Sequence, residues 1–284
     1  MLPGATPSAV GGISPSAPYR YIGEKMSDFL IQDVFPSRRV HLIGGASNVG
    51  KTRWILPTMV DWSKGKPIMG FKSFPVPWAY VSGDRLLIEA QETIKGLGIN
   101  LADIPIIPAF GQHNKTCPQV LVEAAKMGIQ MLVWEGFGDL PPDPQRRMQI
   151  REFLGKVSAY CTESKDFPNG LTVVGIMETP KMKPYERYRN PRERISGAAS
   201  WGYHTSSVIM IEAGKVENPA DPSRILYASL KNAPSFTSLG MFTRDGHLSF
   251  GLPEIIEVMT DEDVDAELRR MKDFINKECR PKTS

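Results

Sequence analysis

The sequence has little of what marks secreted, membrane or metal-binding proteins. It contains only three cysteines in 284 residues, Cys117, Cys161 and Cys279, and their spacing matches no metal-ligand motif. Such sparse cysteine is typical of reduced thiols in an intracellular protein, so we expect a cytoplasmic location. No run of about 18 apolar residues occurs, and the first residues lack the basic-then-apolar order of a signal peptide. We therefore expect neither a transmembrane helix nor a membrane partner.

A strong overall charge is also lacking. Lys and Arg number 34 against 31 Asp and Glu, which leaves a net charge of +3. This balance does not by itself indicate nucleic-acid binding, so any basic patch has to be argued locally. The apolar content of 41% is enough to fill a sizeable core, and the length suits one large domain with appendages.

The two ends of the chain differ in composition from the middle. Residues 1–19 are rich in Pro, Gly, Ser and Ala and carry no charge, so we predict a disordered tail. We assign residues 20–255 to the folded domain. Residues 256–284 contain a helix-start pattern at 260–263 and are predicted to form a C-terminal helix and tail.

The most specific motif is the run Gly45-Ala46-Ser47-Asn48-Val49-Gly50-Lys51-Thr52, which fits the phosphate-binding pattern G-x-x-x-x-G-K-S/T. An apolar strand is predicted before it and a helix after it. Its glycines let backbone N–H groups turn toward phosphate oxygens, and the helix N-terminus adds partial positive charge. We expect Lys51 to reach the β- and γ-phosphates and Thr52 to bind Mg²⁺. The predicted ligands are ATP and Mg²⁺, and the predicted binding residues are Gly45, Ala46, Ser47, Asn48, Val49, Gly50, Lys51, Thr52 and Arg53.

Predicted strands and helices alternate along the rest of the chain. Early strands are nearly continuous apolar runs, which indicates a parallel sheet covered by helices on both faces and an α/β fold. Ligands of such sheets bind beyond the carboxyl ends of the strands. The predicted strands cover 39–44, 78–82, 104–110, 130–134, 170–177, 206–212, 225–232 and 248–250, and the predicted helices cover 24–34, 53–62, 86–97, 120–127 and 145–164.

Two acidic residues directly follow predicted strands. Asp84 follows 78–82 and Glu135 follows 130–134. A phosphate-loop hydrolase needs one carboxylate beside the metal and another to orient the attacking water. We assign Glu135, with Thr52, to the metal and Asp84 to the water, so the predicted catalytic residues are Lys51, Asp84 and Glu135. The alternative interpretation is that each carboxylate only caps the next helix.

The order of these segments resembles the RecA-like ATPase core, and is most similar to the RepA/DnaB-type replicative helicases and related phage ATPases. The similarity covers about residues 35–250 and includes a small-residue segment at 195–201. In 171–181 it implies a γ-phosphate-sensing strand end, where Glu178 or Thr179 stands in place of the family's frequent His. The resemblance implies a mostly parallel twisted sheet, ATP hydrolysis on DNA, and a homo-oligomeric ring or filament with ATP between subunits.

The sequence departs from this family at two positions. Glu135 stands where the family usually has Asp, a mild change because a longer carboxylate still reaches Mg²⁺ through water. The segment 230–234 resembles the strand that offers Lys-x-Arg to a neighbour's ATP; Lys231 is retained as the implied trans-subunit residue, but Ala233 replaces the arginine. It stays open whether another arginine, such as Arg224 or Arg244, takes that role.

The most cationic stretch is 181–194, which carries six Lys or Arg and two Glu. Basic residues interleaved with tyrosines can follow phosphates and stack on the bases of single-stranded nucleic acid. The family resemblance implies that this loop lines a central DNA channel. The alternative is a solvated loop or one that pairs with acidic neighbours. The DNA is expected to be single-stranded, and the residues predicted to contact it are Lys181, Lys183, Tyr185, Arg187, Tyr188, Arg189, Arg192 and Arg194.

The sequence therefore predicts a Mg-dependent, helicase-like ATPase acting on DNA. A nucleoside or small-molecule kinase is one alternative, in which 181–194 forms an arginine lid. An assembly protein stabilised by nucleotide, with little turnover, is another, and the absence of arginine at Ala233 favours it. The sequence does not distinguish a helicase from a recombinase-like or loader ATPase.

Overall fold

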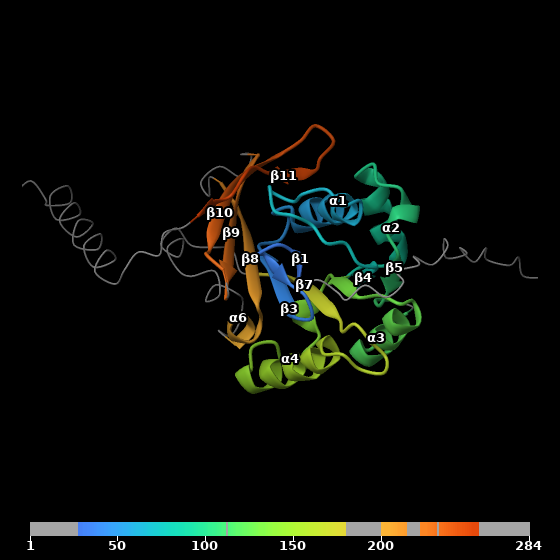
Figure 1. The fold of residues 1–284 in the computed structure, drawn as a ribbon. Coiled ribbons are helices and arrows are strands. Elements are labelled where there is room, and N and C mark those ends of the chain that lie inside the picture. The colour runs from blue at the N-terminus through green and yellow to red at the C-terminus, as the bar shows by residue number, and fades with distance from the viewer. Residues whose placement is uncertain (1–27, 112, 180–199, 215–221, 232, 256–284) are drawn as a thin grey trace, which may run out of the picture.

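A computed structural model describes residues 28–111, 113–179, 200–214, 222–231 and 233–255 (Figure 1). The expectations for the N-terminal tail, for the basic loop and for the C-terminal segment fall on residues outside these ranges.

A ten-stranded sheet forms the centre of the molecule. Its order is β11-β10-β9-β8-β3-β7-β6-β4-β5, and β12 pairs with β10. The strands from β8 to β5 in this order run parallel, whereas β9, β10, β11 and β12 are joined by antiparallel pairing. The strand bounds are β3 (Val40–Gly45), β4 (Trp78–Ser82), β5 (Ile106–Pro108), β6 (Met131–Trp134), β7 (Thr172–Glu178), β8 (Ser207–Ala213), β9 (Ser223–Leu230), β10 (Phe236–Phe242), β11 (Leu248–Phe250) and β12 (Glu254–Ile255), with a separate pair β1 (Phe29–Ile31) and β2 (Phe35–Pro36).

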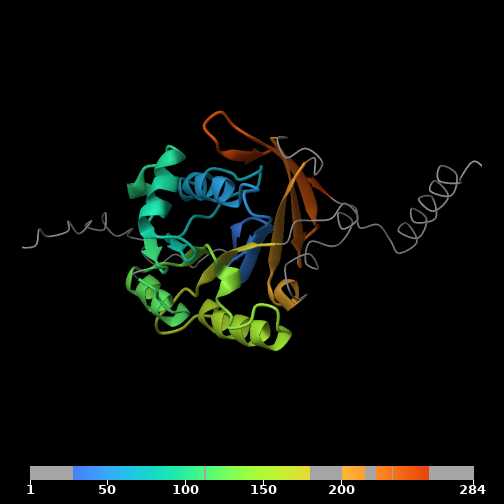
Figure 2. The same ribbon diagram turned by 180° about the vertical axis from the view of Figure 1, so that it is seen from behind.

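Helices cover both faces of the parallel part, as Figures 1 and 2 show from opposite sides. The face packed against α1 and α2 and the face packed against α3, α4 and α6 hold separate hydrophobic clusters. The helix bounds are α1 (Lys51–Ser63), α2 (Leu87–Gly96), α3 (Cys117–Lys126), α4 (Arg147–Cys161) and α6 (Ser200–His204), with 3-10 turns at η1 (Leu101–Asp103) and η2 (Phe137–Asp139).

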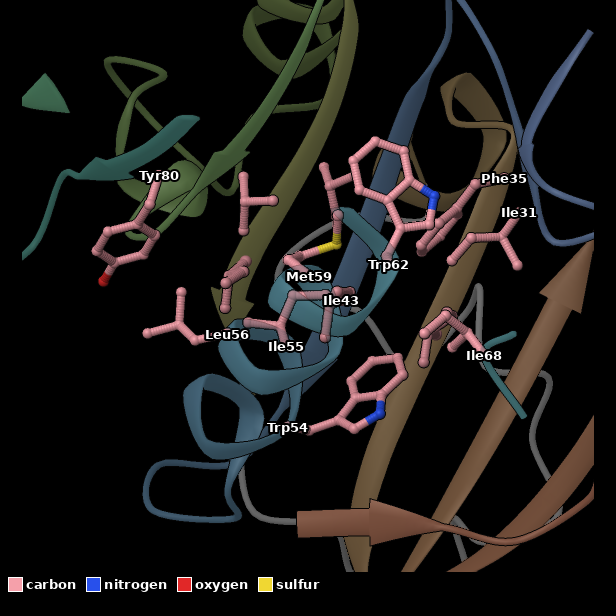
Figure 3. Packing of buried hydrophobic residues seen from close by; sticks show 14 of the residues in the cluster. Ile31, Phe35, Ile43, Trp54, Ile55, Leu56, Met59, Trp62, Ile68 and Tyr80 are labelled. Carbon is pink, nitrogen blue, oxygen red and sulfur yellow. The ribbon is translucent and has the colours of Figure 1, made fainter. Parts of the chain in front are cut away.

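The core alternates between these faces with the period of two expected of strands. In β7, Val174 and Ile176 belong to the α1 side, whereas Val173 and Met177 belong to the α4 side. Beneath α1, a close-packed group surrounds Trp62, whose indole N–H donates to the Leu30 carbonyl at 2.8 Å (Figure 3). These contacts hold the helix that leaves the phosphate loop firmly against the sheet.

The α/β fold with a mostly parallel sheet is confirmed, and so are the eight predicted strands and the helices predicted at 53–62, 86–97, 120–127 and 145–164, with shifts of a few residues at their ends. The helix predicted at 24–34 is wrong in its described part, because Phe29–Ile31 is a strand paired with β2. The strand β10 was missed. Trp54, Trp134 and Trp201 are buried in the core.

Candidate functional site

The phosphate loop connects the end of β3 to the start of α1. It is built on left-handed backbone at Asn48 (φ 60°) and Gly50 (φ 104°). A side chain at position 50 would also collide with the ring of Phe242, since an added Cβ would lie 2.7 Å from a ring carbon. Glycine is therefore required at this turn, where the loop ends and α1 begins.

Lys51 is the first residue of α1, and its side chain folds back over the loop. Its ammonium donates to the carbonyls of Gly45 and Ala46, at 2.8 and 2.9 Å. Lys51 is 8% exposed, and this burial lowers the pKa of its ammonium, while Glu178, Glu135 and Asp84 oppose the shift. The cation is thus held at the mouth of the loop with acidic groups around it.

Glu135, at the carboxyl end of β6, lies at the centre of a buried polar network. Its Oε1 accepts from the Thr52 hydroxyl and from Arg85 Nη2, both at 2.6 Å, and its Oε2 accepts from the hydroxyl of Tyr80. Burial raises the pKa of Glu135, as does Asp84, whereas Arg85, Thr52 and Tyr80 lower it. Burial and Glu135 likewise raise the pKa of Tyr80 well above its ordinary value, so this phenol stays a proton donor.

Asp84 follows β4 and lies next to the segment that follows β6. A Cβ added at Gly136 would lie 2.9 Å from the Asp84 Cβ. Asp84 is not the cap of the next helix, because the N-cap of α2 is Leu86, whose N–H donates to Glu89 at 2.9 Å. This finding argues against the alternative role considered for Asp84.

These groups share one cleft of about 860 Å³ at the carboxyl edge of the parallel strands. Burial raises the pKa of Asp139 in this cleft, and Asp84 and Glu178 raise it further. Acidic groups on one wall and the loop with Lys51 on the other give the cleft the polarity that a phosphate-bound cation requires. The lining residues are Ser47, Asn48, Gly50, Lys51, Thr52, Arg53, Asp84, Arg85, Thr93, Glu135, Gly136, Gly138, Asp139, Pro144, Ile176, Met177, Glu178, Trp201, Arg224 and Phe242.

Residues from the antiparallel end of the sheet also line this cleft. Arg224 of β9 donates from Nε to the carbonyl of Val49 at 2.9 Å, and its guanidinium lies 4.8 Å from the centre of the Phe242 ring. Arg53 lies 5.9 Å from the same ring and donates to the carbonyl of Gly246 at 3.3 Å. Two arginines and one aromatic ring therefore lie beside the phosphate loop.

The positions of the sequence-predicted residues separate into three groups. Lys51, Thr52, Asp84 and Glu135 come together in the cleft, although their chemical roles stay predictions. Lys231 lies at the opposite edge of the sheet, where its ammonium donates to the Tyr203 carbonyl at 2.6 Å. The eight nucleic-acid candidates in 181–194 lie outside the described residues.

Several residues that line the cleft or contact its lining were not assigned roles from the sequence. Arg85 directly follows Asp84, so the sequence could have indicated Arg85 as a cation next to a strand-end acid. Tyr80 lies within a strand and its link to Glu135 carries no sequence signal. Arg224 was considered only as a possible substitute for a neighbour's arginine, yet it lines the cleft of its own chain, whereas Arg244 is exposed in the turn after β10.

The side chains of the cleft fit a nucleoside triphosphate with a divalent cation. The Thr52 hydroxyl and the Glu135 carboxylate lie 2.6 Å apart, and both are oxygen ligands of the kind that Mg²⁺ binds directly or through water. The loop backbone and Lys51 supply the positive side of a phosphate cradle. Thr52 and Glu135 would therefore hold the metal, and Lys51 and the loop would hold the phosphates.

Comparisons with known proteins support the fold. No protein-family model matches the sequence, and no curated protein matches it. Among solved structures, the chain is similar to a KaiC-like protein from the hyperthermophilic archaeon Pyrococcus horikoshii OT3, with a TM-score of 0.52 and 13% sequence identity. The alignment covers 78% of this chain and 94% of that chain. At this identity the similarity shows a shared RecA-like fold and nothing finer.

In the part of the chain that the structure describes, no helix combines the length and the apolar character needed to cross a bilayer.

Proposed function

We propose that this protein binds ATP with Mg²⁺ and hydrolyses it, as an ATPase of the RecA-like class. The observation that carries the proposal is the hydrogen bond of 2.6 Å between Thr52, at the start of α1, and Glu135, at the end of β6. It joins the phosphate loop to a strand-end carboxylate, which are the two parts that a metal-bound triphosphate must contact together.

Each residue has a defined task in this proposal. Lys51 turns from the carbonyls of Gly45 and Ala46 toward the phosphates, while the loop N–H groups hold the remaining phosphate oxygens. Thr52 and Glu135 position the metal, and Asp84 orients the attacking water. Mg²⁺, when bound, neutralises charge on the phosphates as the terminal group is transferred. Catalysis then depends mainly on positioning and on fixed charge.

The decisive experiment measures ATP turnover with Mg²⁺, with a chelator, and with single-stranded DNA, together with particle size with and without nucleotide. We expect Mg-dependent turnover that DNA increases. ATP binding without turnover, but with a nucleotide-dependent gain in size, would favour the assembly protein. That alternative has one structural argument: in the described residues, three donors already occupy Glu135.

We further propose that this ATPase acts on DNA, which it binds through the basic loop 181–194 of a homo-oligomer related to the RepA/DnaB-type helicases. The net charge of +4 in this loop and its two tyrosines support the proposal. The finer assignment among helicase, recombinase-like protein and loader depends on the oligomer formed on DNA.

The loop can be tested by neutralising Arg187, Arg189 and Arg192 together. DNA binding should weaken, and the log–log salt slope should become shallower by about 0.7 for each lost contact to single-stranded DNA. Basal ATP turnover should persist. Normal DNA binding with lost basal turnover would instead identify the loop as a catalytic lid and favour the kinase alternative. A matched control neutralises three exposed lysines elsewhere, Lys64, Lys66 and Lys95.

A further inference from the structure

Arg85 is a cleft cation that pairs with both strand-end acids, and its Nη1 also donates to Thr93 Oγ1 at 3.3 Å. Its Nη2 lies 2.6 Å from Glu135 Oε1, and its Nε lies 3.4 Å from Asp84 Oδ1. The backbone is fixed, since the Ser82 hydroxyl donates to the Arg85 carbonyl at 2.8 Å. The side chain keeps 28% exposure, whereas that of Glu135 keeps only 5%. Arg85 therefore has an anchored backbone and a guanidinium that still faces the cleft.

The guanidinium lies beside the predicted metal position. Arg85 and Thr52 donate to the same oxygen of Glu135, each at 2.6 Å, so the two groups are immediate neighbours. In a phosphate loop, the hydroxyl at this position marks the end of the site where the terminal phosphate lies. Arg224 differs in this respect, because it contacts the Val49 carbonyl and the Phe242 ring.

Mg²⁺ held by Thr52 and Glu135 would repel the Arg85 guanidinium and would compete with it for the Glu135 carboxylate. The terminal phosphate offers the guanidinium a new anionic partner whose oxygens match its planar set of N–H donors. A rotation of the side chain exchanges one ion pair for the other, and the anchored backbone limits the movement to the cleft of the same chain.

We propose that Arg85 leaves Glu135 when the nucleotide binds and contacts the terminal phosphate within its own subunit, so that it supplies the arginine that is missing at Ala233. This inference rests on the proposed ATPase function. As the water oxygen bonds to the terminal phosphorus, the bond from phosphorus to the bridging oxygen breaks and the electron pair stays on ADP; of the two protons of the water, one stays on the inorganic phosphate and the other is released to solvent. Arg85 stabilises the negative charge on the transferred group in that transition state.

The first test compares Arg85→Ala and Arg85→Lys with the natural protein. We expect Arg85→Ala to lower turnover at saturating ATP by about a thousandfold, the scale of arginine fingers in other phosphate-loop enzymes. Affinity for a non-hydrolysed ATP analogue should change less than about threefold. Retention of ADP with aluminium fluoride, which imitates the group in transfer, should be lost. Arg85→Lys should restore little of this retention, since a lysine ammonium lacks the planar set of N–H donors that a guanidinium presents to phosphate oxygens.

The readouts separate the inference from its rivals. Lys66→Ala, which removes an exposed lysine paired with Asp61, serves as the control for a lost ion pair, and circular dichroism checks that each variant folds. If Arg85→Ala retains ADP with aluminium fluoride as the natural protein does, Arg85 is only the partner of Glu135 and the inference is wrong. If the natural protein neither binds nor hydrolyses ATP, the proposed function fails and takes the inference with it.

The second test asks whether Arg85 acts within its own subunit. Chains carrying Lys51→Ala and chains carrying Arg85→Ala are co-expressed, so that mixed oligomers form. Action within one subunit predicts no recovery of turnover, because every chain lacks one of the two residues. Recovery would show that Arg85 reaches a neighbour's nucleotide, and it would overturn the proposal.

Discussion

The parallel and antiparallel parts of the sheet are built differently. In β6 every residue is buried, because helices cover both faces. In β10, by contrast, Ser238 and Gly240 face inward while Leu239 and Met241 are 64% and 54% exposed. The parallel part holds the phosphate loop and the strand-end acids, and the antiparallel part adds Arg224 and Phe242 from one side. We infer that the chemistry depends on the parallel part and that the antiparallel part tunes ligand binding.

The largest effect should come from Lys51→Ala in the parallel part. The ammonium is 8% exposed and aimed at the loop, so its loss removes the main positive charge from the phosphate site. We expect turnover to fall to background and ATP affinity to weaken by at least about tenfold, an effect of about 1.4 kcal/mol or more. Isothermal titration and a phosphate-release assay measure the two quantities. A folded variant with unchanged affinity and turnover would remove Lys51 from the site.

A smaller effect is expected from the two acids at the ends of β4 and β6. Glu135→Gln and Asp84→Asn keep the shape of the side chains but remove the charges that position the metal and the water. Turnover should fall by about a hundredfold in each case, which is the lower range for a positioned acid or base. ATP affinity should change by only a few-fold. Asp61→Asn, at a partly exposed position outside the cleft, is a charge-matched control, and an equal loss of affinity and turnover would contradict the assigned roles.

The parallel part could largely be predicted from the sequence, because strands that are buried on both faces have nearly continuous apolar sequences. The residue after such a strand lies at the carboxyl edge by geometry, which is why Asp84 and Glu135 were found. The strand β10 was not predicted because its pattern is inverted: Ser238 is buried and Leu239 is exposed. Such a strand does not show the alternation by which a half-buried strand is identified.

The cleft was only partly predictable for a related reason. Lys51 and Thr52 belong to one local motif, whereas the contact of Arg85 with Glu135 joins residues 50 positions apart. The approach of Phe242 to Gly50 depends on the register of three antiparallel strands, β8, β9 and β10. Sequence spacing determines which residues follow a strand, but it does not determine which side chains meet across the sheet.

A third prediction compares packing in the two parts through a pair of glycines. A Cβ at Gly175 in β7 would lie 2.3 Å from the ring of Phe137, which is itself fully buried among aromatic rings. Gly175→Ala should therefore lower the free energy of unfolding by about 1–3 kcal/mol. At Gly251, beside β10, the nearest atom to an added Cβ is 3.6 Å away, so Gly251→Ala should change stability by less than about 0.5 kcal/mol. Urea denaturation measures both, and equal losses would show that the antiparallel part is packed as tightly as the parallel part.

The smallest effect is expected from Phe242→Ala, which tests whether the antiparallel part tunes binding without taking part in hydrolysis. The Phe242 ring lies against Gly50 of the phosphate loop and has the guanidinium groups of Arg224 and Arg53 at 4.8 and 5.9 Å. Each such cation–π contact at a partly exposed site contributes about 0.5–1 kcal/mol, so losing the ring should loosen both arginines beside the loop.

ATP affinity should consequently fall by about threefold to tenfold, on the scale of that energy. Turnover at saturating ATP should be unchanged, because Lys51, Asp84 and Glu135 keep their positions on the parallel strands. Met241→Ala is the matched control, since Met241 precedes Phe242 in the same strand but is exposed on the other face of β10. A loss of maximal turnover in Phe242→Ala would show that the antiparallel strands contribute to hydrolysis as well as to binding. An equal loss of affinity in Met241→Ala would show that the effect is not specific to the Phe242 ring. Either result would contradict the separate roles assigned to the two parts of the sheet.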